Sequence, residues 1–328
     1  MNFRPLASGF RALAATALLT LGAAAHAQGA WPDRQVRFIN PYAAGGASDS
    51  VTRILAAKLS EMWKQPVVVD NRAGGGGNIG VELATRAAPD GYTLLTSTVG
   101  THGINPHLFR KLPYDPIKDF EPVSLAATTV SILTVNPSLP VKTVQEFIAY
   151  ARANPDKLTF GSSGNGSSHH LAGVMLNTLA NVKTRHVPYK GTAAMMTDLI
   201  GGQIDFTFDP ILSSLQHVKA GKLRALAVSS PERVASLPDL PTMHEAGATG
   251  YDVGSWYGIL APAGTPKPIV NKISRDIATA LSAADVKAKL EGAGAIPIGS
   301  TPEQLGAHIR KELAKWGPVV KSSGATVD

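Results

Sequence analysis

The chain has 328 residues, of which 44% are hydrophobic and 17% charged, and it carries a formal net charge of +7 and no cysteine. This composition is typical of a soluble globular protein long enough for two domains, and it excludes an intrinsically disordered chain. The lack of cysteine excludes disulfides and thiolate chemistry. Because the basic residues are scattered, the charge gives no reason to expect nucleic-acid binding.

The first 27 residues have the pattern of an export signal. Arg4 and Arg11 precede an apolar run of small residues and leucines, and Ala25-His26-Ala27 matches a cleavage site. The run is short for a membrane span. We therefore predict a signal peptide, residues 1–27, that is cleaved after Ala27 and directs the mature chain out of the cytoplasm.

The next segments alternate between β-branched runs and helical patterns. Their order predicts a parallel β-α-β-α-β unit with strands at 36–41, 65–70 and 92–99 and helices at 48–63 and 78–88. A long extended stretch, 120–135, is interpreted as a crossing into a second lobe.

A second α/β series follows the crossing. It predicts helices at 143–154, 168–180, 192–201 and 211–220 and strands at 158–161, 184–188, 204–209 and 223–230. The extended residues 251–261 are interpreted as the return crossing, and the remainder is predicted to be helical. A capping box at Thr301–Gln304 starts the last helix, which is expected to pack back onto the first lobe.

Two crossings predict two doubly wound α/β lobes with a ligand cleft between them. The first lobe is discontinuous, with residues 28–128 and 252–328, and the second comprises residues 129–251. In such sheets ligands bind beyond the carboxyl ends of the strands, so the loops there are the candidate site.

The loop after the first predicted strand is rich in small residues. Gly45 and Gly46 would let main-chain N–H groups approach an anion at the start of the following helix, and Tyr42 would provide an apolar wall. Asp49 lies in the first turn of that helix, where helix capping is favoured over ligand binding.

A second glycine-rich loop contains the pattern G-x-G-x-x-G at Gly75, Gly77 and Gly80, between a predicted strand and a predicted helix. This pattern is typical of dinucleotide-binding turns, but no acidic residue ends the next strand. We therefore favour a turn that lines the cleft, and we expect no cofactor.

The loop 161–170 of the second lobe is rich in serine and ends in His169 and His170. Serine hydroxyls and exposed amides suit a carboxylate, whereas Ser167 or Ser168 is expected to cap the helix. Adjacent histidines cannot chelate one metal, so helix-start or surface positions are expected and no metal is. Asp209, at a strand end, is a candidate acceptor for a ligand hydroxyl or amine.

Eight motifs follow in order along the chain and together resemble the Bug-type solute receptors of tripartite tricarboxylate transporters. They begin at Pro41, Val67, Ala88, Gly164, Val187, Gly201, Leu237 and Trp256, and include Ala88-Pro89-Asp90-Gly91-Tyr92 and Val187-Pro188-Tyr189-Lys190-Gly191. The resemblance covers essentially the whole chain after the signal. The run Gly74–Gly77 departs from the family pattern, which often has proline there.

The resemblance implies a type II periplasmic-binding fold and a carboxylate held between the lobes without an arginine. It implies a periplasmic monomer that works with inner-membrane transporter subunits. Carried over position by position, the implied ligand-binding residues are Tyr42, Ala43, Gly45, Gly46, Asn78, Ser97, Ser162, Ser163, Asn165, His169 and Asp209.

Three functions follow from these observations. The first is a solute receptor that delivers a small organic acid to a transporter and catalyses nothing. The second is a ligand-dependent partner of a periplasmic sensor kinase domain, using the same pocket. The third is an exported hydrolase that uses Ser163 or Ser167, which the absence of a G-x-S-x-G elbow in this loop disfavours.

Overall fold

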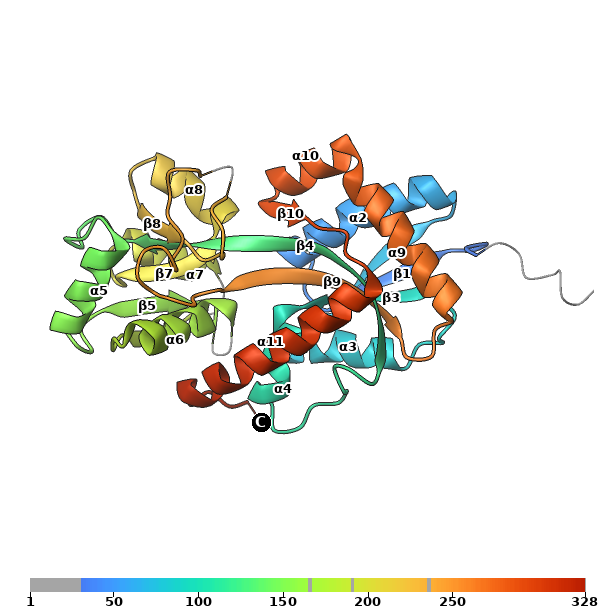
Figure 1. The fold of residues 1–328 in the computed structure, drawn as a ribbon, viewed down its shortest axis with the longest axis horizontal. Helices are drawn as coiled ribbons and strands as arrows, with labels where there is room; N and C mark the ends of the chain where they lie inside the picture. The colour runs from blue at the N-terminus through green and yellow to red at the C-terminus, as the bar shows by residue number, and fades with distance from the viewer. Residues whose placement is uncertain (1–30, 165–166, 190–191, 235–236, 328) are drawn as a thin grey trace, which may run out of the picture.

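The computed structural model describes residues 31–164, 167–189, 192–234 and 237–327 (Figure 1). The predicted signal peptide lies outside the described residues. Within them, no helix is long and apolar enough to cross a bilayer.

The first lobe contains the predicted parallel unit. Strand β1 (Val36–Asn40) pairs in parallel with β2 (Val67–Asn71) on one side and β3 (Thr93–Thr98) on the other. Helices α2 (Ala47–Trp63) and α3 (Asn78–Thr85) connect the strands. The prediction of this unit is confirmed.

The second lobe repeats the pattern around a shorter parallel set. Strand β5 (Thr159–Ser162) pairs in parallel with β6 (Arg185–Pro188) and β7 (Phe206–Pro210), while β8 (Arg224–Val228) pairs with the crossing strand β4 (Phe120–Val135). Its helices are α5 (Val144–Ala153), α6 (Ser168–Ala180), α7 (Thr192–Ile200) and α8 (Ile211–Lys219).

Two long antiparallel strands join the lobes. Strand β4 (Phe120–Val135) has 16 residues, and its first part pairs with β9 (Gly254–Pro262) and β10 (Ala295–Pro297). Its last part pairs with β7 and β8, so one strand belongs to both lobes. Figure 1 shows β4 and β9 as the two ribbons that run from one half of the molecule to the other. The strand order is β2-β1-β3-β9-β4-β7-β5-β6, which fits the predicted two-crossing architecture.

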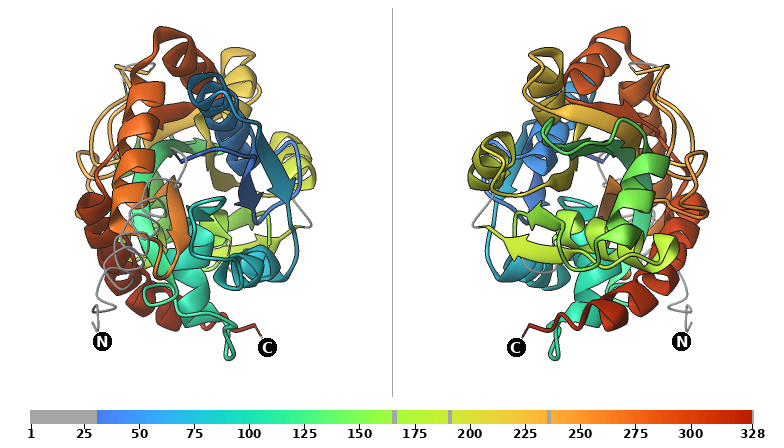
Figure 2. Two further views of the ribbon diagram at one scale, coloured as in Figure 1. Left: turned by 90° about the vertical axis from the view of Figure 1, so that its right-hand side faces the viewer. Right: turned by 90° about the vertical axis from the view of Figure 1, so that its left-hand side faces the viewer.

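The C-terminal segment differs from the prediction in one element. Helices α9 (Lys267–Ser282), α10 (Ala284–Gly292) and α11 (Pro302–Ser323) are present, but the short strand β10 interrupts the predicted helical remainder. The capping box at the start of α11 is confirmed. Figure 2 shows the C-terminal helices, coloured orange to red, along one side of the molecule.

Helix α11 packs on both lobes rather than on the first alone. It contacts the π-helix η3 (Gly100–Ile104) and α4 (Asn105–Leu108), two elements that were not predicted, and also α6 of the second lobe. One buried hydrophobic cluster accordingly runs from Leu95 through Trp316 to Leu176 and Phe206. The two lobes therefore share a hydrophobic core.

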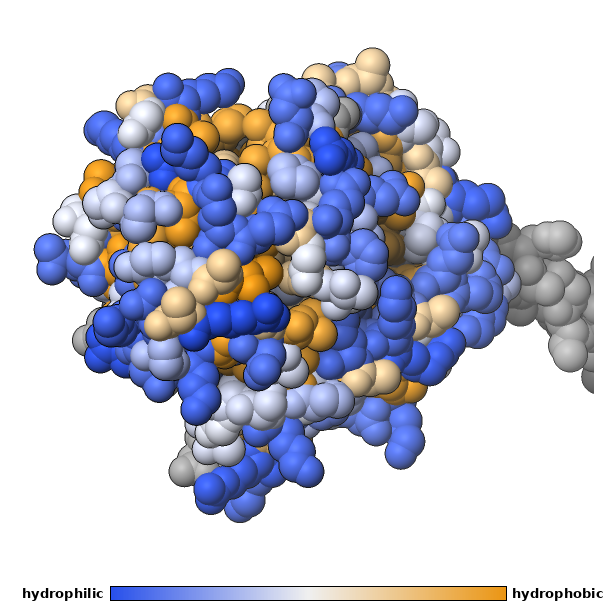
Figure 3. All heavy atoms as spheres, turned by 60° about the vertical axis from the view of Figure 1, so that its left-hand side comes forward, coloured by the Kyte–Doolittle hydropathy of each residue, from blue (hydrophilic) through white to orange (hydrophobic). Residues whose placement is uncertain are grey.

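The surface on the face drawn in Figure 3 is largely hydrophilic, with small apolar groups.

Candidate functional site

A buried acid holds the loop that follows β1. Asp49, in the first turn of α2, accepts hydrogen bonds from the Gly45 amide at 2.9 Å, the Asn71 side chain at 2.8 Å and the Arg53 guanidinium at 2.9 Å. Burial alone would raise the pKa of Asp49, but these hydrogen bonds bring it below its usual value. Asp49 thus has a structural role, but it supports the loop rather than capping α2, which has no side-chain cap hydrogen bond.

The loop presents main chain to solvent above this support. Residues 43–47 are exposed, while the Tyr42 hydroxyl lies 2.9 Å from Thr98 Oγ1 and the Tyr42 carbonyl accepts from Asn71 at 3.0 Å. Gly45 has a φ of 87°, which an L-residue rarely adopts. Because α2 starts directly after Gly46, its first N–H groups lack helical partners and point out of the exposed loop.

The second glycine-rich loop is a close-packed turn. Gly74–Gly77 all have positive φ. A Cβ on Gly80 would lie 2.8 Å from both the Arg72 carbonyl oxygen and Pro41 Cα. The glycines therefore let two loops approach each other, which accounts for the G-x-G-x-x-G pattern without a dinucleotide.

Asn78 begins α3 with a fixed side-chain amide. Its Oδ1 accepts from Asn105 Nδ2 at 2.7 Å and from the Tyr114 hydroxyl at 3.1 Å. Its Nδ2 has no hydrogen-bond partner among the described residues. The orientation of the amide is set by its acceptor side, so the NH₂ group remains as a donor.

Ser97 has a structural contact instead. It is fully buried, and its hydroxyl donates to the Gly258 carbonyl at 3.0 Å, where β3 and β9 lie side by side. The structure does not bring its hydroxyl to the exposed loops.

The second lobe contains a chain of three hydrogen-bonded side chains, here called the Ser163 relay: Ser163, His169 and Asp209. Ser163 Oγ lies 3.1 Å from His169 Nδ1, and His169 Nε2 lies 3.1 Å from Asp209 Oδ1. Exposure falls along the relay, from the partly exposed Ser163 to 9% for His169 and 0% for Asp209. The relay thus runs from a partly exposed serine to a buried carboxylate.

One expectation about these residues was wrong. Asp209 Oδ2 accepts from the hydroxyls of Ser213 and of Ser214, the latter at 2.8 Å, so neither oxygen of this buried acid faces a ligand. His169 and His170 lie in the first turn of α6, one of the two positions expected for them, and both are buried. All three residues of the relay were candidates from the sequence, but local pattern could not show that Asp209, 40 residues further along, contacts His169.

Two further predicted positions lie beside the relay. Ser162 is buried, and its Oγ lies 2.6 Å from His186 Nε2. The His186 ring stacks on His170 with centroids 3.8 Å apart, and burial followed by the charge of His170 lowers the pKa of His186 to about 4. Ser167 caps α6 by accepting from the His170 amide, as predicted. Asn165 lies outside the described residues.

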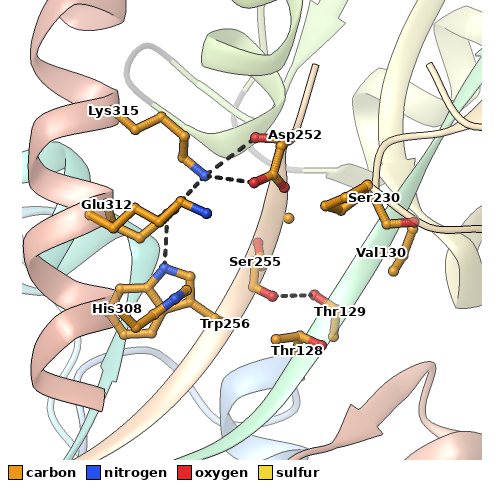
Figure 4. A pocket seen from close by; sticks show the side chains of 13 residues that line it. Thr128, Thr129, Val130, Ser230, Asp252, Ser255, Trp256, His308, Glu312 and Lys315 are labelled. Atoms are coloured by element: carbon orange, nitrogen blue, oxygen red, sulfur yellow. Dashed lines mark hydrogen bonds and ion pairs between the residues drawn. The ribbon is translucent and has the colours of Figure 1, made fainter. Parts of the chain in front are cut away.

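Two cavities are lined by none of the predicted ligand-binding residues. One, of about 140 Å³, lies where β4 and β9 face α11 (Figure 4). There, the buried Glu312 accepts from the indoles of Trp256 at 3.0 Å and Trp316 at 2.9 Å and pairs with Lys315. The other, of about 330 Å³, is bordered by His170, His186 and the end of α11. Sequence reasoning found neither cavity.

The part of the chain that the structure describes contains no set of side chains suited to bind a metal ion. No group of three or more histidine, cysteine or acidic side chains is placed to hold an ion there. What the described loops offer is a set of neutral hydrogen-bond donors.

Comparison with known proteins identifies the relatives of this chain. Residues 51–325 match the family model described as tripartite tricarboxylate transporter family receptor. A Pseudomonas protein, named UPF0065 protein in the tcbD-tcbE intergenic region, is 38% identical over 94% of this chain and 93% of its own length. Protein BugT of Bordetella pertussis is 34% identical, with 90% and 91% covered.

Solved structures agree with these relatives. Rpa4515 of Rhodopseudomonas palustris with adipate is 39% identical, with a TM-score of 0.80, and the match covers 90% of this chain and all of that one. MatC of Rhodopseudomonas palustris with bound malate is 36% identical, with a TM-score of 0.75 and 88% and 100% covered.

Proposed function

Because the chain belongs to the receptor family of tripartite tricarboxylate transporters, we propose that it captures a small organic carboxylate and catalyses no reaction. The observation that carries this proposal is the exposed loop after β1, which Asp49 fixes and which offers main-chain donors without an arginine. Such a loop at the start of a 17-residue helix suits an anion. The relatives with adipate and malate indicate the class of ligand.

The ligand is proposed to lie between the lobes. Residues 28–128 with 252–328 form one lobe and residues 129–251 the other, and β4 and β9 are the segments about which the lobes would close. The donors proposed for the first lobe are the NH₂ group of Asn78 and the amides of the loop Tyr42–Gly46, except that of Gly45, which donates to Asp49. Those for the second lobe are Ser163 and the undescribed Asn165.

Calorimetric titration of the mature protein tests this proposal. A panel of mono-, di- and tricarboxylates that includes adipate and malate should contain at least one acid that binds saturably and raises the melting temperature. Asn78→Ala should weaken this binding by about tenfold, because one hydrogen bond to a charged group contributes about 1.5 kcal/mol. Absence of heat and of a thermal shift with every acid would contradict the proposal.

The location and the partners follow from the family. We propose that the chain works in the periplasm as a monomer, delivering its ligand to inner-membrane transporter subunits. Signalling through a sensor kinase domain is the alternative that uses the same site. Loss of uptake of the ligand in a deletion strain supports transport, whereas unchanged uptake with ligand-dependent capture of a sensor domain supports signalling.

One observation favours a second candidate, an exported hydrolase. The Ser163 relay has the order of groups of a Ser-His-Asp triad, although His169 faces the serine with Nδ1 rather than Nε2. Hydrolysis of p-nitrophenyl esters that is lost in Ser163→Ala, and kept in Ser167→Ala, would support this candidate. Ester turnover no greater than that of Ser163→Ala supports the receptor.

A further inference from the structure

The hydrogen bonds of the Ser163 relay determine which ring nitrogen of His169 carries a proton and in which direction the Ser163 hydroxyl donates. Asp209, as a carboxylate, can only accept, and its Oδ2 is taken by Ser213 and Ser214. The group that reaches Oδ1 is His169 Nε2, so this nitrogen carries a proton. In the neutral ring, Nδ1 is then an acceptor, and the Ser163 hydroxyl must donate to it.

When His169 is neutral, the relay therefore presents a hydrogen-bond acceptor to an anion, which needs a donor. With its proton directed at His169, Ser163 offers only lone pairs to a ligand. When His169 gains a second proton, Nδ1–H donates to Ser163 Oγ, and the Ser163 hydroxyl is free to donate outward. The accessible end of the relay thus changes from acceptor to donor with the protonation of one buried ring.

The charges around His169 favour the same change. Asp209 is a buried negative charge on the far side of the ring, and no lysine or arginine is bonded to any member of the relay among the described residues. A ligand carboxylate at Ser163 would place a second negative charge on the near side. An imidazolium between the two carboxylates neutralises one of these charges, whereas a neutral ring leaves both.

Among the described residues, Asp209 of β7 is the one titratable group that is hydrogen-bonded to the His169 ring. Ser163, just after β5, is its other partner, and the α8 hydroxyls bond Asp209 rather than the ring. The next residue of its own helix, His170, stacks on His186 of β6. Helix α11 reaches α6 with Ser322 and Ser323, which border the cavity beside His170.

We propose that the second lobe binds a ligand carboxylate together with one proton, which His169 takes from solvent and Asp209 stabilises. The receptor then selects acids that carry a second carboxylate at neutral and lower pH. An acid that ends in a hydroxyl instead donates to the neutral relay and binds without a proton. This inference rests on the proposed receptor function and adds the chemistry of the second end of the ligand.

The test counts protons on binding. Adipate and glutarate are titrated into the full mature protein at pH 7 and 8 in buffers that differ in ionisation enthalpy, and so are 6-hydroxyhexanoate and 5-hydroxypentanoate. We expect proton uptake with a dicarboxylate and an affinity that rises up to about tenfold per pH unit as the pH falls, the limit for one proton. The hydroxy acids should bind without uptake.

Variants assign the proton to the ring. His169→Gln retains a donor toward Asp209 but cannot titrate, so dicarboxylate binding should weaken about tenfold and lose its pH dependence. His244→Gln, at an exposed histidine outside the relay, is the matched control and should behave as the unsubstituted protein. If His169→Gln does not fold, proton counting on the unsubstituted protein decides alone.

The outcomes separate the two proposals. Dicarboxylate binding without proton uptake, or pH-dependent binding retained in His169→Gln, overturns this inference and leaves the receptor function intact. Binding of monocarboxylates but of neither dicarboxylate overturns it as well. Failure of every acid in the panel to bind overturns both.

Discussion

The two lobes use opposite means to present polar groups. In the first, Asp49 fixes a loop from below and exposed main chain forms the surface, with close glycine contacts setting its shape. In the second, Asp209 fixes a histidine and a side-chain hydroxyl forms the surface. Main-chain amides donate at every physiological pH, whereas the proposed change of Ser163 from acceptor to donor depends on the protonation of His169. The hydrogen-bonding role of the proposed first-lobe donors is therefore fixed, whereas that of Ser163 in the second lobe changes with protonation.

The largest expected effect tests the dependence of the first lobe on backbone contact. Gly80→Ala places a Cβ 2.8 Å from backbone atoms of Arg72 and Pro41, neither of which can turn away as a side chain would. We expect a loss of about 3 kcal/mol in the free energy of unfolding, measured in urea.

Gly292→Ala is the control for this change, since nothing lies within 4 Å of its new methyl group. It should change stability by no more than about 0.5 kcal/mol. Equal effects of the two substitutions would show that the contacts around Gly80 are unimportant.

A smaller effect tests the support of the second lobe. Asp209→Ala removes the acceptor of His169, Ser213 and Ser214, and leaves buried donors unsatisfied. We expect a loss of about 2 kcal/mol of stability by urea unfolding. Asp239→Ala, at an exposed acid, should stay within about 0.5 kcal/mol of the unsubstituted protein. A neutral Asp209→Ala would mean that the relay does not hold this lobe together.

The smallest effect concerns pH. Burial and the charge of His170 lower the pKa of His186 to about 4, whereas the pKa of a histidine in the unfolded chain is about 6.5. Between these values the unfolded chain binds more protons, so the stabilisation present above pH 6.5 is lost as the pH falls toward 4. Because His186 is partly exposed, we expect about 1 kcal/mol for its share.

Thermal unfolding across pH 4 to 8 measures this loss. His186→Gln should reduce the slope below pH 6.5, whereas His107→Gln, at an exposed histidine, should leave it unchanged. His102 of the first lobe, whose pKa burial lowers to about 3, keeps a residual slope in both variants. A slope that is the same in His186→Gln would exclude His186 as its source.

Much of the fold follows from local pattern. The predicted crossing 120–135 coincides with β4, and the predicted helix 168–180 with α6, because β-branched runs and cap residues mark their ends. Strand β10 was missed: it has only 3 residues and interrupts the remainder that was predicted to be helical. Helix α10 lies within that remainder and is separated from α9 by the single extended residue Ala283.

The candidate site was predictable in position but not in roles. Asp209 and His169 were expected near the carboxyl ends of the second-lobe strands, and they lie there. Their burial and their mutual contact depend on how β5, β7 and α6 come together, which no local periodicity reports. Local pattern also could not show that the Ser97 hydroxyl donates to the carbonyl of Gly258, on a strand far along the chain.

The long strand β4 also constrains the order of assembly. All its partners, β7, β8, β9 and β10, follow it in the sequence. Strand β3 also pairs with β9, and the paired residues Ser97 and Gly258 are 161 positions apart in the sequence. Sheets closed by such distant segments form slowly, since chain entropy must be lost before the contacts repay it. For a polypeptide with a predicted export signal, we expect this delay to keep the discontinuous first lobe unfolded during translocation until β9 and the segments after it are available.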